Sequence, residues 1–393
     1  MPNHEPNPTA LNEVLELLSE QGFEGMANAM QILLNEAMKL ERSEFLGAAP
    51  HERSASRRGW ANGFKPKRVA TRAGEVELRI PQVRDVEEGQ PGFYPKSLER
   101  GVRSERALKL AIAEMYVQGV STRRVAEITR ELCGLDVSSA QVSRASAALD
   151  GELEAWRTRE LGRCKYMIID ARYEKVRHGG SVVSCAVLSA IGVRNDGKRS
   201  VLGVSVALSE AEVHWRNFIS SLLQRKLHGV ELIVSDDHQG LKAALRACLP
   251  SVPWQRCQFH LQRNATAYVP RLAMRREVAD ALRGIFNAHD RAEADRQLAL
   301  AVAGFRETAP KLAEWMEHNI PEGLTIFALP SMHRRLLRTS NVLERLNKEI
   351  KRRTRVATLF PNEASLLRLV SAVLAEISED WETGRIYLTL DNG

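Results

Sequence analysis

The chain has 393 residues, which is too long for one ordinary domain core, and 44 % hydrophobic and 27 % charged residues are typical of a folded protein. No stretch approaches about 18 consecutive apolar residues, and the first residues lack a signal-peptide pattern, so we expect a cytoplasmic protein without a membrane segment. Five scattered cysteines favour reduced thiols over a disulfide framework.

The net charge of +7 permits nucleic-acid binding, but many basic proteins bind none. The positions of the charges are more informative, because arginine and lysine form short clusters near predicted turns and helix ends. These clusters are Arg53–Arg58, Lys65–Arg68, Arg334–Arg335 and Lys351–Arg355. One cluster can simply be a solvated face, but four together favour a polyanion as the partner.

The N-terminal part contains helical and hairpin patterns. Apolar spacing over 10–46, interrupted at Gly22 and Gly25, predicts two amphipathic helices in a first segment, 1–46, which pack or self-associate. The second segment, 47–103, begins with a basic loop at 47–68 that is expected to order on a partner. A β-hairpin follows between Val69 and Val83.

The third segment, 104–160, has the pattern of a helix-turn-helix. One helix begins behind a Ser/Thr cap and ends at Gly134, and another begins behind a second serine cap near Ser138. A plain helical hairpin is the alternative. The residues predicted to contact DNA in this segment are Arg123, Arg124, Ser139, Gln141 and Arg144.

The fourth segment, 161–257, changes to a strand pattern. Three apolar stretches separated by tight-turn signals predict an antiparallel meander: Tyr166–Arg177, Ser181–Val193 and Val201–Leu208. A helix over 210–227 and a strand over 230–235 follow, and this fourth strand can pair parallel to the first because a helix precedes it. With a further helix over 239–248, the order is that of an α/β, ribonuclease-H-like core with a mixed sheet.

The rest of the chain is predicted to be helical. Residues 258–335 show no strand signal and are interpreted as an all-α insertion into the core. The last segment, 336–393, completes the core with helices over 341–353 and 362–380. We expect a frayed tail from Leu388 to Gly393.

Three carboxylates have positions suited to metal binding. Asp170 lies in the first strand beside Ile168 and Ile169, where an ionised carboxylate needs a compensating partner. Asp236 ends the fourth strand, and Glu344 lies in the first turn of a helix that a cap at Thr339–Asn341 begins. Hard oxygen ligands of this kind suit two Mg²⁺ ions, for which Mn²⁺ can substitute, and arginines after Glu344 can clamp phosphates.

Spacing alone is weak support, since the chain has 49 acidic residues, but several segments resemble insertion-sequence transposases of the IS256 family, related to the Mutator type. The segments lie in the family's order along nearly the whole chain. They are Arg57–Phe64, Phe93–Pro95, Tyr116–Arg123, Asp170–Arg177, Ser235–Leu241, Cys257–Asn264 and Thr339–Arg353.

The resemblance implies a ribonuclease-H-like fold, a helical insertion between the second and third acids, and a catalytic triad of Asp170, Asp236 and Glu344. Asp237 is the alternative second acid. Cys257 and His260 form a family signature near the active site, where they are expected to support it; core packing or a zinc half-site are the alternatives. Further expected DNA contacts are Arg263, Lys351, Arg352, Arg353 and Arg355.

The function predicted from these features is that of a transposase that binds terminal inverted repeats, cuts a DNA strand and joins it to target DNA by attack of the freed 3′-hydroxyl on a target phosphodiester. A homodimer or larger assembly is expected, because two DNA ends must be brought together. The alternatives are a DNA-binding repressor without catalysis and a nuclease without strand transfer.

Overall fold

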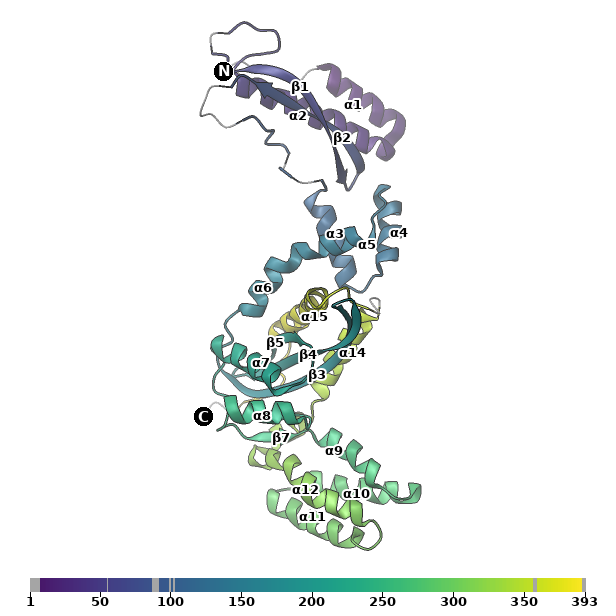
Figure 1. Ribbon diagram of the computed structural model, residues 1–393, viewed down its shortest axis with the longest axis vertical. Coiled ribbons are helices and arrows are strands. Elements are labelled where there is room, and N and C mark those ends of the chain that lie inside the picture. Colours follow the sequence, from purple (N-terminus) through teal and green to yellow (C-terminus); the bar gives the residue numbers. More distant parts are fainter. Residues whose placement is uncertain are drawn as a thin grey trace. The chain divides into compact units, whose positions relative to one another are not determined.

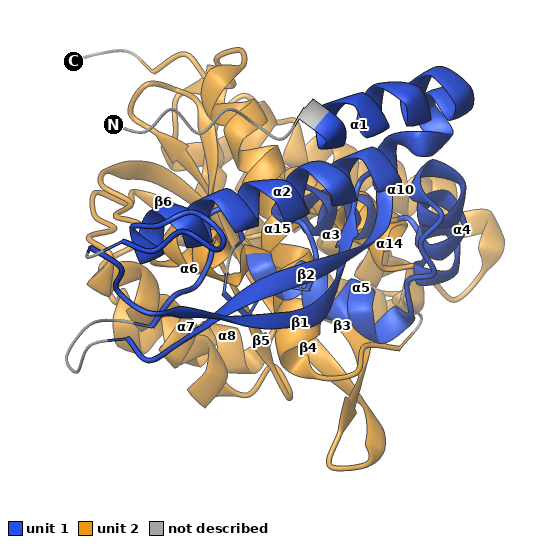
Figure 2. Ribbon diagram, turned by 90° about the horizontal axis from the view of Figure 1, so that it is seen from above, with its two compact units in different colours: residues 1–116, 120–148 blue, residues 117–119, 149–393 orange. Residues whose placement is uncertain are grey.

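The computed structural model describes residues 8–54, 56–86, 92–98, 100–101, 103–355 and 359–390. The chain forms two compact units (Figures 1 and 2). Unit 1 comprises Met1–Tyr116 and Val120–Ala148, and unit 2 comprises Val117–Gly119 and Leu149–Gly393. Across the described parts of the chain, no helix is long and apolar enough to cross a membrane.

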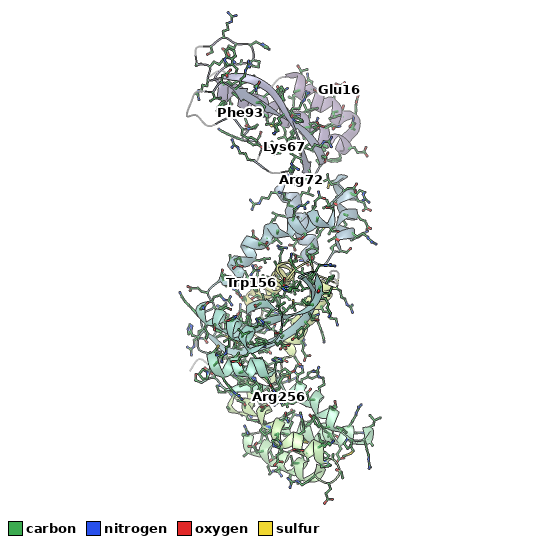
Figure 3. The ribbon with its side chains drawn as sticks, viewed as in Figure 1. Glu16, Lys67, Arg72, Phe93, Trp156 and Arg256 are labelled. Atoms are coloured by element: carbon green, nitrogen blue, oxygen red, sulfur yellow. The ribbon has the colours of Figure 1, made fainter. Side chains whose placement is uncertain are left out.

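Unit 1 begins with two helices and a β-hairpin. The two helices predicted there are confirmed as α1 (Pro8–Gln21) and α2 (Met26–Leu46), separated by the 3-10 turn Gly22–Gly25. The hairpin joins β1 (Trp60–Thr71) to β2 (Gly74–Arg84), and Figure 3 labels Lys67 and Arg72 in this region. In β2, Val76, Leu78 and Ile80 are buried in one cluster with Met38 of α2, while the residues between them are exposed.

The prediction of a loop over 47–68 is wrong for its last part. Residues 60–68 belong to β1 and pair in antiparallel register with β2. Nearly all of them are exposed, and Trp60 and Phe64 are the only large apolar side chains among them, so apolar and polar residues do not alternate regularly. Without that alternation the sequence contains no strand signal.

The two capped helices predicted in the third segment are present. They are α4 (Thr122–Cys133) and α5 (Ser139–Ser146), and they follow α3 (Arg106–Val117). The Ser121 hydroxyl accepts a hydrogen bond from the Arg124 backbone N–H, and Gly134 ends α4 in the left-handed conformation. Ser138 and Gln141 form a capping box at the start of α5. Val125 and Val142 lie in the apolar cluster that joins the three helices.

Unit 2 is built on a five-stranded mixed sheet with the order β5-β4-β3-β6-β7. The predicted meander is confirmed as β3 (Cys164–His178), β4 (Ser181–Arg194) and β5 (Arg199–Ala207), which pair antiparallel. The predicted parallel strand is β6 (Leu232–Ser235), beside β3. A further parallel strand, β7 (Trp254–Arg256), was not predicted, because three residues are too few to show a periodic pattern.

Helices cover this sheet. After the turn Ala147–Leu149, α6 (Asp150–Thr158) leads into β3. Side chains from α7 (Glu212–Gln224) and α8 (Gln239–Cys248) share one apolar cluster with Met167 and Ile169 of β3. The last two helices, α14 (Asn341–Thr354) and α15 (Glu363–Thr383), both contact β3.

The segment predicted to be a helical insertion is helical. It contains α9 (Gln258–Ala265), α10 (Arg275–Phe286), α11 (Arg291–Phe305), α12 (Pro310–Asn319) and α13 (Ser331–Leu337), with 3-10 turns at Thr266–Tyr268, Leu272–Met274, Ile320–Gly323 and Thr325–Ala328. The buried amides of Gln255 and Gln258 both donate to the Gly323 carbonyl, at 2.7 and 2.8 Å. These bonds attach the returning end of the segment to the edge of the sheet.

The prediction of a frayed tail is wrong for Leu388, and residues 391–393 lie outside the described residues. The backbone N–H groups of Tyr387 and Leu388 donate to the Gly197 carbonyl at 3.0 Å, and the Leu388 side chain is buried. Gly197 has φ +75°, and a Cβ there would collide with the Leu388 carbonyl oxygen. The turn between β4 and β5 therefore needs glycine for both its conformation and its close contact.

We predict that Gly197→Ala lowers the free energy of unfolding by more than about 2 kcal/mol, since the left-handed backbone alone costs about 1–2 kcal/mol and the collision adds to it. Gly179→Ala is the matched control, because Gly179 has φ +55° in the β3–β4 turn but no atom lies within 4 Å of the place that an added Cβ would take. Urea unfolding of both variants would measure the difference. Equal losses would show that the contact with Leu388 is unimportant.

Candidate active site

Asp170 lies in β3 directly after three fully buried residues, Met167, Ile168 and Ile169. The pKa of its carboxyl is raised to about 6, mainly by burial, with smaller contributions from the negative charges of Asp236 and Glu210. The side-chain amide of Asn347 donates to Asp170 Oδ2 at 2.9 Å. Because Asn347 lies one helical turn after Glu344, α14 presents both residues toward β3.

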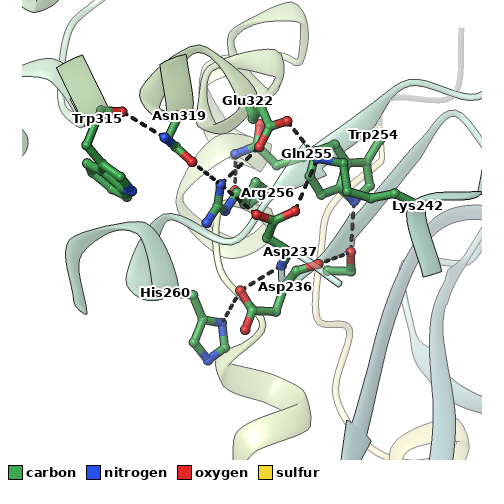
Figure 4. Close-up of polar contacts among 11 residues, drawn as sticks. Asp236, Asp237, Lys242, Trp254, Gln255, Arg256, His260, Trp315, Asn319 and Glu322 are labelled. Atoms are coloured by element: carbon green, nitrogen blue, oxygen red, sulfur yellow. Dashed lines mark hydrogen bonds and ion pairs between the residues drawn. The ribbon is translucent and has the colours of Figure 1, made fainter. Parts of the chain in front are cut away.

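The two adjacent acids after β6 have different surroundings (Figure 4). Asp237 forms ion pairs at 3.1 Å with both Arg256 and Lys242, and these two cations also bind Glu322. Asp236 makes no ion pair with a lysine or arginine of the described residues, and its Oδ1 accepts a hydrogen bond from the Asp237 N–H at 2.7 Å. These contacts neutralise Asp237 and favour Asp236 as the second acid.

His260 lies between the second and third acids. Its Nδ1 is 3.8 Å from Asp236 Oδ1, and its Nε2 is 3.9 Å from Glu344 Oε1. The pKa of His260 is raised, mainly by its hydrogen bond to Cys257 and also by the negative charge of Asp236. His260 Nδ1 and Glu344 Oε1 are buried without a hydrogen-bond partner in the described structure. One imidazole thus connects carboxylates from β6 and α14.

Cys257 connects this imidazole to the start of the Glu344 helix. The backbone N–H and the hydroxyl of Ser340 both lie 3.3 Å from Cys257 Sγ. Burial raises the pKa of the Cys257 thiol, but hydrogen bonds from His260 and Ser340 outweigh burial and lower it. The helix was expected to begin with an ordinary cap at 339–341. Ser340 is indeed the N-cap residue, but its hydroxyl donates to the Cys257 thiol and makes no capping hydrogen bond.

The acids suit a divalent cation, although their arrangement is not that of a closed metal site. Within the described residues, no three His, Cys, Asp or Glu side chains form a metal-binding group, and His260 lies between two of the acids instead. The unpartnered Glu344 oxygen and the burial of the Asp170 carboxylate, which raises its pKa, are both features that a cation would relieve. For the zinc alternative at Cys257 and His260, the described residues supply no further ligands.

Two residues that act on Asp170 were not predicted from the sequence. Asn347 donates a hydrogen bond to its carboxylate, and the charge of Glu210 helps to raise its pKa. Glu210, in the turn before α7, lies 3.8 Å from His238 Nδ1, and its charge contributes to the raised pKa of Asp170. A Cβ at Gly240 would collide with the Glu210 backbone carbonyl, so the turn packs tightly on the start of α8. Glu210 follows a strand without any motif, so only the fold could reveal it. Asn347 could have been found, because it lies at helical spacing from the third acid.

The residues expected to contact DNA differ in how freely they can do so. Arg123, Arg144, Arg263, Lys351 and Arg355 are exposed. Arg124 and Arg352 are exposed but paired with Glu127 and Glu349, at 2.8 and 2.7 Å. The Ser139 hydroxyl donates to Thr122, and the Gln141 side-chain oxygen is occupied by the capping box. Lys351 and Arg355 line a surface hollow with Arg172 of β3.

Arg353 has to be removed from the expected DNA contacts. Its side chain is only 6 % exposed and forms ion pairs with Glu349 at 3.0 Å and Glu376 at 2.8 Å. It also donates to the Val117 carbonyl at 3.4 Å. Arg353 lies on the buried face of α14 with Leu346 and Ile350, so its role is to hold α14 against α15.

We predict that Arg353→Ala lowers the free energy of unfolding by about 2 kcal/mol, because breaking a buried ion pair costs about 3–5 kcal/mol and the partner glutamates are partly exposed. Arg352→Ala is the matched control: it removes the exposed neighbour of the same Glu349, and we expect less than about 0.5 kcal/mol. Denaturant unfolding measures both. A similar loss in the two variants would contradict the structural role of Arg353.

We predict that Asp170→Asn stabilises the protein in the presence of a metal chelator at pH 7.5. The pKa of Asp170 in the folded protein, about 6, exceeds its ordinary value of 3.8, so stability falls as pH rises through this window and the penalty is complete above it. The variant lacks this penalty, and we expect a gain on the order of 1 kcal/mol that disappears near pH 4. Thermal unfolding across this pH range measures it, and a pH-independent difference would contradict the assignment.

The comparisons with known proteins agree with one another. A family model described as "Transposase, Mutator family" matches residues 7–384. The chain is 56 % identical to the transposase for insertion sequence element IS406 from Burkholderia multivorans (strain ATCC 17616 / 249), over 98 % of each chain. It is 42 % identical to the transposase for ISRM5 from Rhizobium meliloti (strain 1021), over 94 % of this chain and 92 % of that one. The transposase for IS256 in transposon Tn4001 from Staphylococcus aureus is 34 % identical, over 93 % of each.

The chain therefore belongs to the Mutator family of transposases, as the sequence resemblance implied. Transposases act on DNA, and membership of the family implies DNA-cutting and transfer activity.

Proposed function

We propose that this protein is the transposase of an insertion sequence and that Asp170, Asp236 and Glu344 form its catalytic triad. The observation that carries the proposal is the position of His260, whose two ring nitrogens lie 3.8 and 3.9 Å from Asp236 and Glu344. Asp170 is electrostatically coupled to the same histidine and to Asp236. Acids from β3, β6 and α14 thus gather at one place, although 174 positions separate Asp170 from Glu344.

The arrangement of the sheet supports a ribonuclease-H-like core. Three antiparallel strands are followed by two parallel ones, and Asp236 lies at the carboxyl end of β6, where α/β sheets place their ligands. The helical segment from α9 to α13 lies between the second and third acids in the sequence. This agrees with an insertion that separates Glu344 from the rest of the site.

The triad would hold Mg²⁺, or Mn²⁺ in its place; two such ions activate an attacking hydroxyl and stabilise the leaving oxygen of a phosphodiester. The protein's own groups prepare the acids for this role. Asn347 orients Asp170, and the Cys257–Ser340 contact sets the start of the helix that carries Glu344. His260 supplies positive charge between Asp236 and Glu344 while it is protonated.

The reaction proposed is cleavage of a strand at the terminal inverted repeat, followed by attack of the new 3′-hydroxyl on target DNA. The exposed Arg263, Lys351 and Arg355 of unit 2 and the residues Arg123 and Arg144 of unit 1 are proposed as DNA contacts. A homodimer or larger assembly on the DNA is part of the proposal, since two ends must be processed together.

We predict that Asp170→Asn, Asp236→Asn and Glu344→Gln each reduce Mg²⁺-dependent cleavage of labelled terminal-repeat DNA by at least about a thousandfold, because each removes a charged ligand at the reacting phosphate. Asp237→Asn is the matched control, since Asp237 is paired with Arg256 and Lys242, and it should retain most of the cleavage rate. Undiminished cleavage by the three triad variants would overturn the proposal. DNA binding by the wild type without cutting or joining would instead show a repressor.

We predict that Cys257→Ala slows cleavage about tenfold to a hundredfold, the usual effect of removing a group that orients metal ligands. Cys257→Ser keeps an acceptor for Ser340 and should recover part of the rate, whereas Cys257→Val fills the space without an acceptor and should not. Single-turnover cleavage rates at saturating DNA measure this effect separately from binding. Equal rates for the serine and valine variants would contradict the positioning role.

A further inference from the structure

One short segment of unit 1 is strongly basic. Residues 47–84, which end with the β1–β2 hairpin, contain nine Lys and Arg against three Glu, a net charge of +6. The helices before it, over 8–46, contain two Lys and Arg against seven Glu, a net charge of −5. The hairpin side of this part of the unit therefore attracts a polyanion, and the helical side repels it.

Exposed aromatic rings lie within this basic segment. Trp60 is 55 % exposed and Phe64 is 44 % exposed. The Arg57 guanidinium lies 4.9 Å from the centre of the Trp60 ring, and that of Arg42 lies 5.0 Å from the centre of Phe64. Large apolar rings on a polar strand cost free energy in water, which a partner that covers them would recover, and the guanidinium groups beside the rings favour an anionic partner.

One arginine of this segment is held in place by hydrogen bonds, whereas two other basic side chains are exposed. Arg57 donates to the backbone carbonyls of Ala49 and Glu52 at 3.1 and 2.6 Å, while its Nε is buried without a partner in the described structure. Arg57 also lines a surface hollow with Arg53, Ser54 and Trp60. Arg58 and Lys65 are exposed, and no ion pair or side-chain hydrogen bond engages them within the described part of the chain.

The hairpin is hydrogen-bonded to the residues just before α3, in the same unit as the predicted helix-turn-helix. Ala70 forms a β-bridge with Ser104, and its backbone N–H and carbonyl bond to Arg103 and Glu105 at 3.0 and 2.8 Å. The Arg72 N–H donates to the Glu105 carboxylate at 2.9 Å, just before α3 begins. At about 3.3 Å per residue, a 12-residue strand extends about 40 Å, slightly more than one turn of duplex DNA, about 34 Å.

We propose that the surface formed by residues 47–54 and 56–84 is a second DNA-binding surface, which contacts the phosphodiester backbone beside the duplex segment that α4 and α5 contact. This inference rests on the proposed function, because it assumes that the protein's substrate is duplex DNA. Arg58 and Lys65 bind phosphates. Arg57, held by its hydrogen bonds, and the Trp60 ring beside it form a rigid border of this surface that contacts the DNA. The acidic helices of a second copy would match the charge of this surface, but they would not use the exposed rings paired with guanidinium groups.

The test measures the affinity of the full-length protein for terminal-repeat DNA as a function of salt, in an Asp170→Asn background that separates binding from cleavage. Each lost phosphate contact lowers the slope of log K against log salt by about 0.9. We expect a reduction of about 0.9 for Arg58→Ala or Lys65→Ala and about 1.8 for the double variant, with affinity lowered about tenfold or more near physiological salt. Trp60→Ala should weaken binding with little change in slope, because it removes no charge.

Lys39→Ala is the matched control, because it removes one exposed positive charge from the acidic helix α2 and should leave the slope unchanged. An unchanged slope for the double variant, with wild-type DNA binding intact, would overturn this inference alone. Absence of DNA binding by the wild type would overturn the proposed function as well. If the double variant had a different molecular mass from the wild type in sedimentation but the same salt slope, the surface would be assigned to contact with a second copy. That result would also overturn the inference.

Discussion

The burial of carboxylates close to one another beside β3 and β6 is the constraint on which the site depends. Burial is the main cause of the raised pKa of Asp170, the charges of Asp236 and Glu210 add to it, and Glu344 approaches His260 from α14. Nothing apolar can satisfy such a group, so the fold places His260 between two of the acids and the Asn347 amide on a third. A protonated imidazole compensates part of the negative charge, and a divalent cation is the partner that would compensate the rest.

The surrounding structure serves to keep these acids in place. Arg256 is buried and joins Asp237 to Glu322, so the residue next to Asp236 is fixed to the returning end of the helical segment. On the other side, Arg353 holds α14 against α15, and Cys257 receives two hydrogen bonds from Ser340 at the start of α14. Thus β6, α9 and α14 are connected by buried polar contacts, which are strongly directional and therefore suited to fixing geometry.

Much of the fold could be predicted from local chemistry. The turn signals at Gly179–Gly180 and Asn195–Gly197 separated the three strands of the meander, and the serine caps located α4 and α5. Asp170 lies in β3 and Asp236 directly follows β6, as the strand patterns around them predicted. By contrast, β7 is too short and the exposed part of β1 too polar to produce a periodic signal. Glu210 belongs to no motif, and only the packing of its turn on Gly240 brings it near the site.

Two points about the site residues were not resolved in the sequence, for different reasons. Asp236 and Asp237 are adjacent, so spacing cannot separate them, and only the cations beside Asp237 distinguish the two. Arg353 could have been recognised in the sequence, because it follows Leu346 and Ile350 at helical spacing on the buried face of α14. The cluster of basic residues around it suggested a uniform DNA-binding stretch and concealed that periodicity.

The most direct test of the account is Mn²⁺ binding to the full-length protein at pH 7.5, measured by electron paramagnetic resonance without DNA. The account predicts that the wild type and Asp237→Asn bind Mn²⁺ alike. It also predicts that Asp170→Asn, Asp236→Asn and Glu344→Gln each weaken binding at least about tenfold, since each removes one charged oxygen ligand. Equal binding by all five proteins would contradict the claim that these three carboxylates form one cation site.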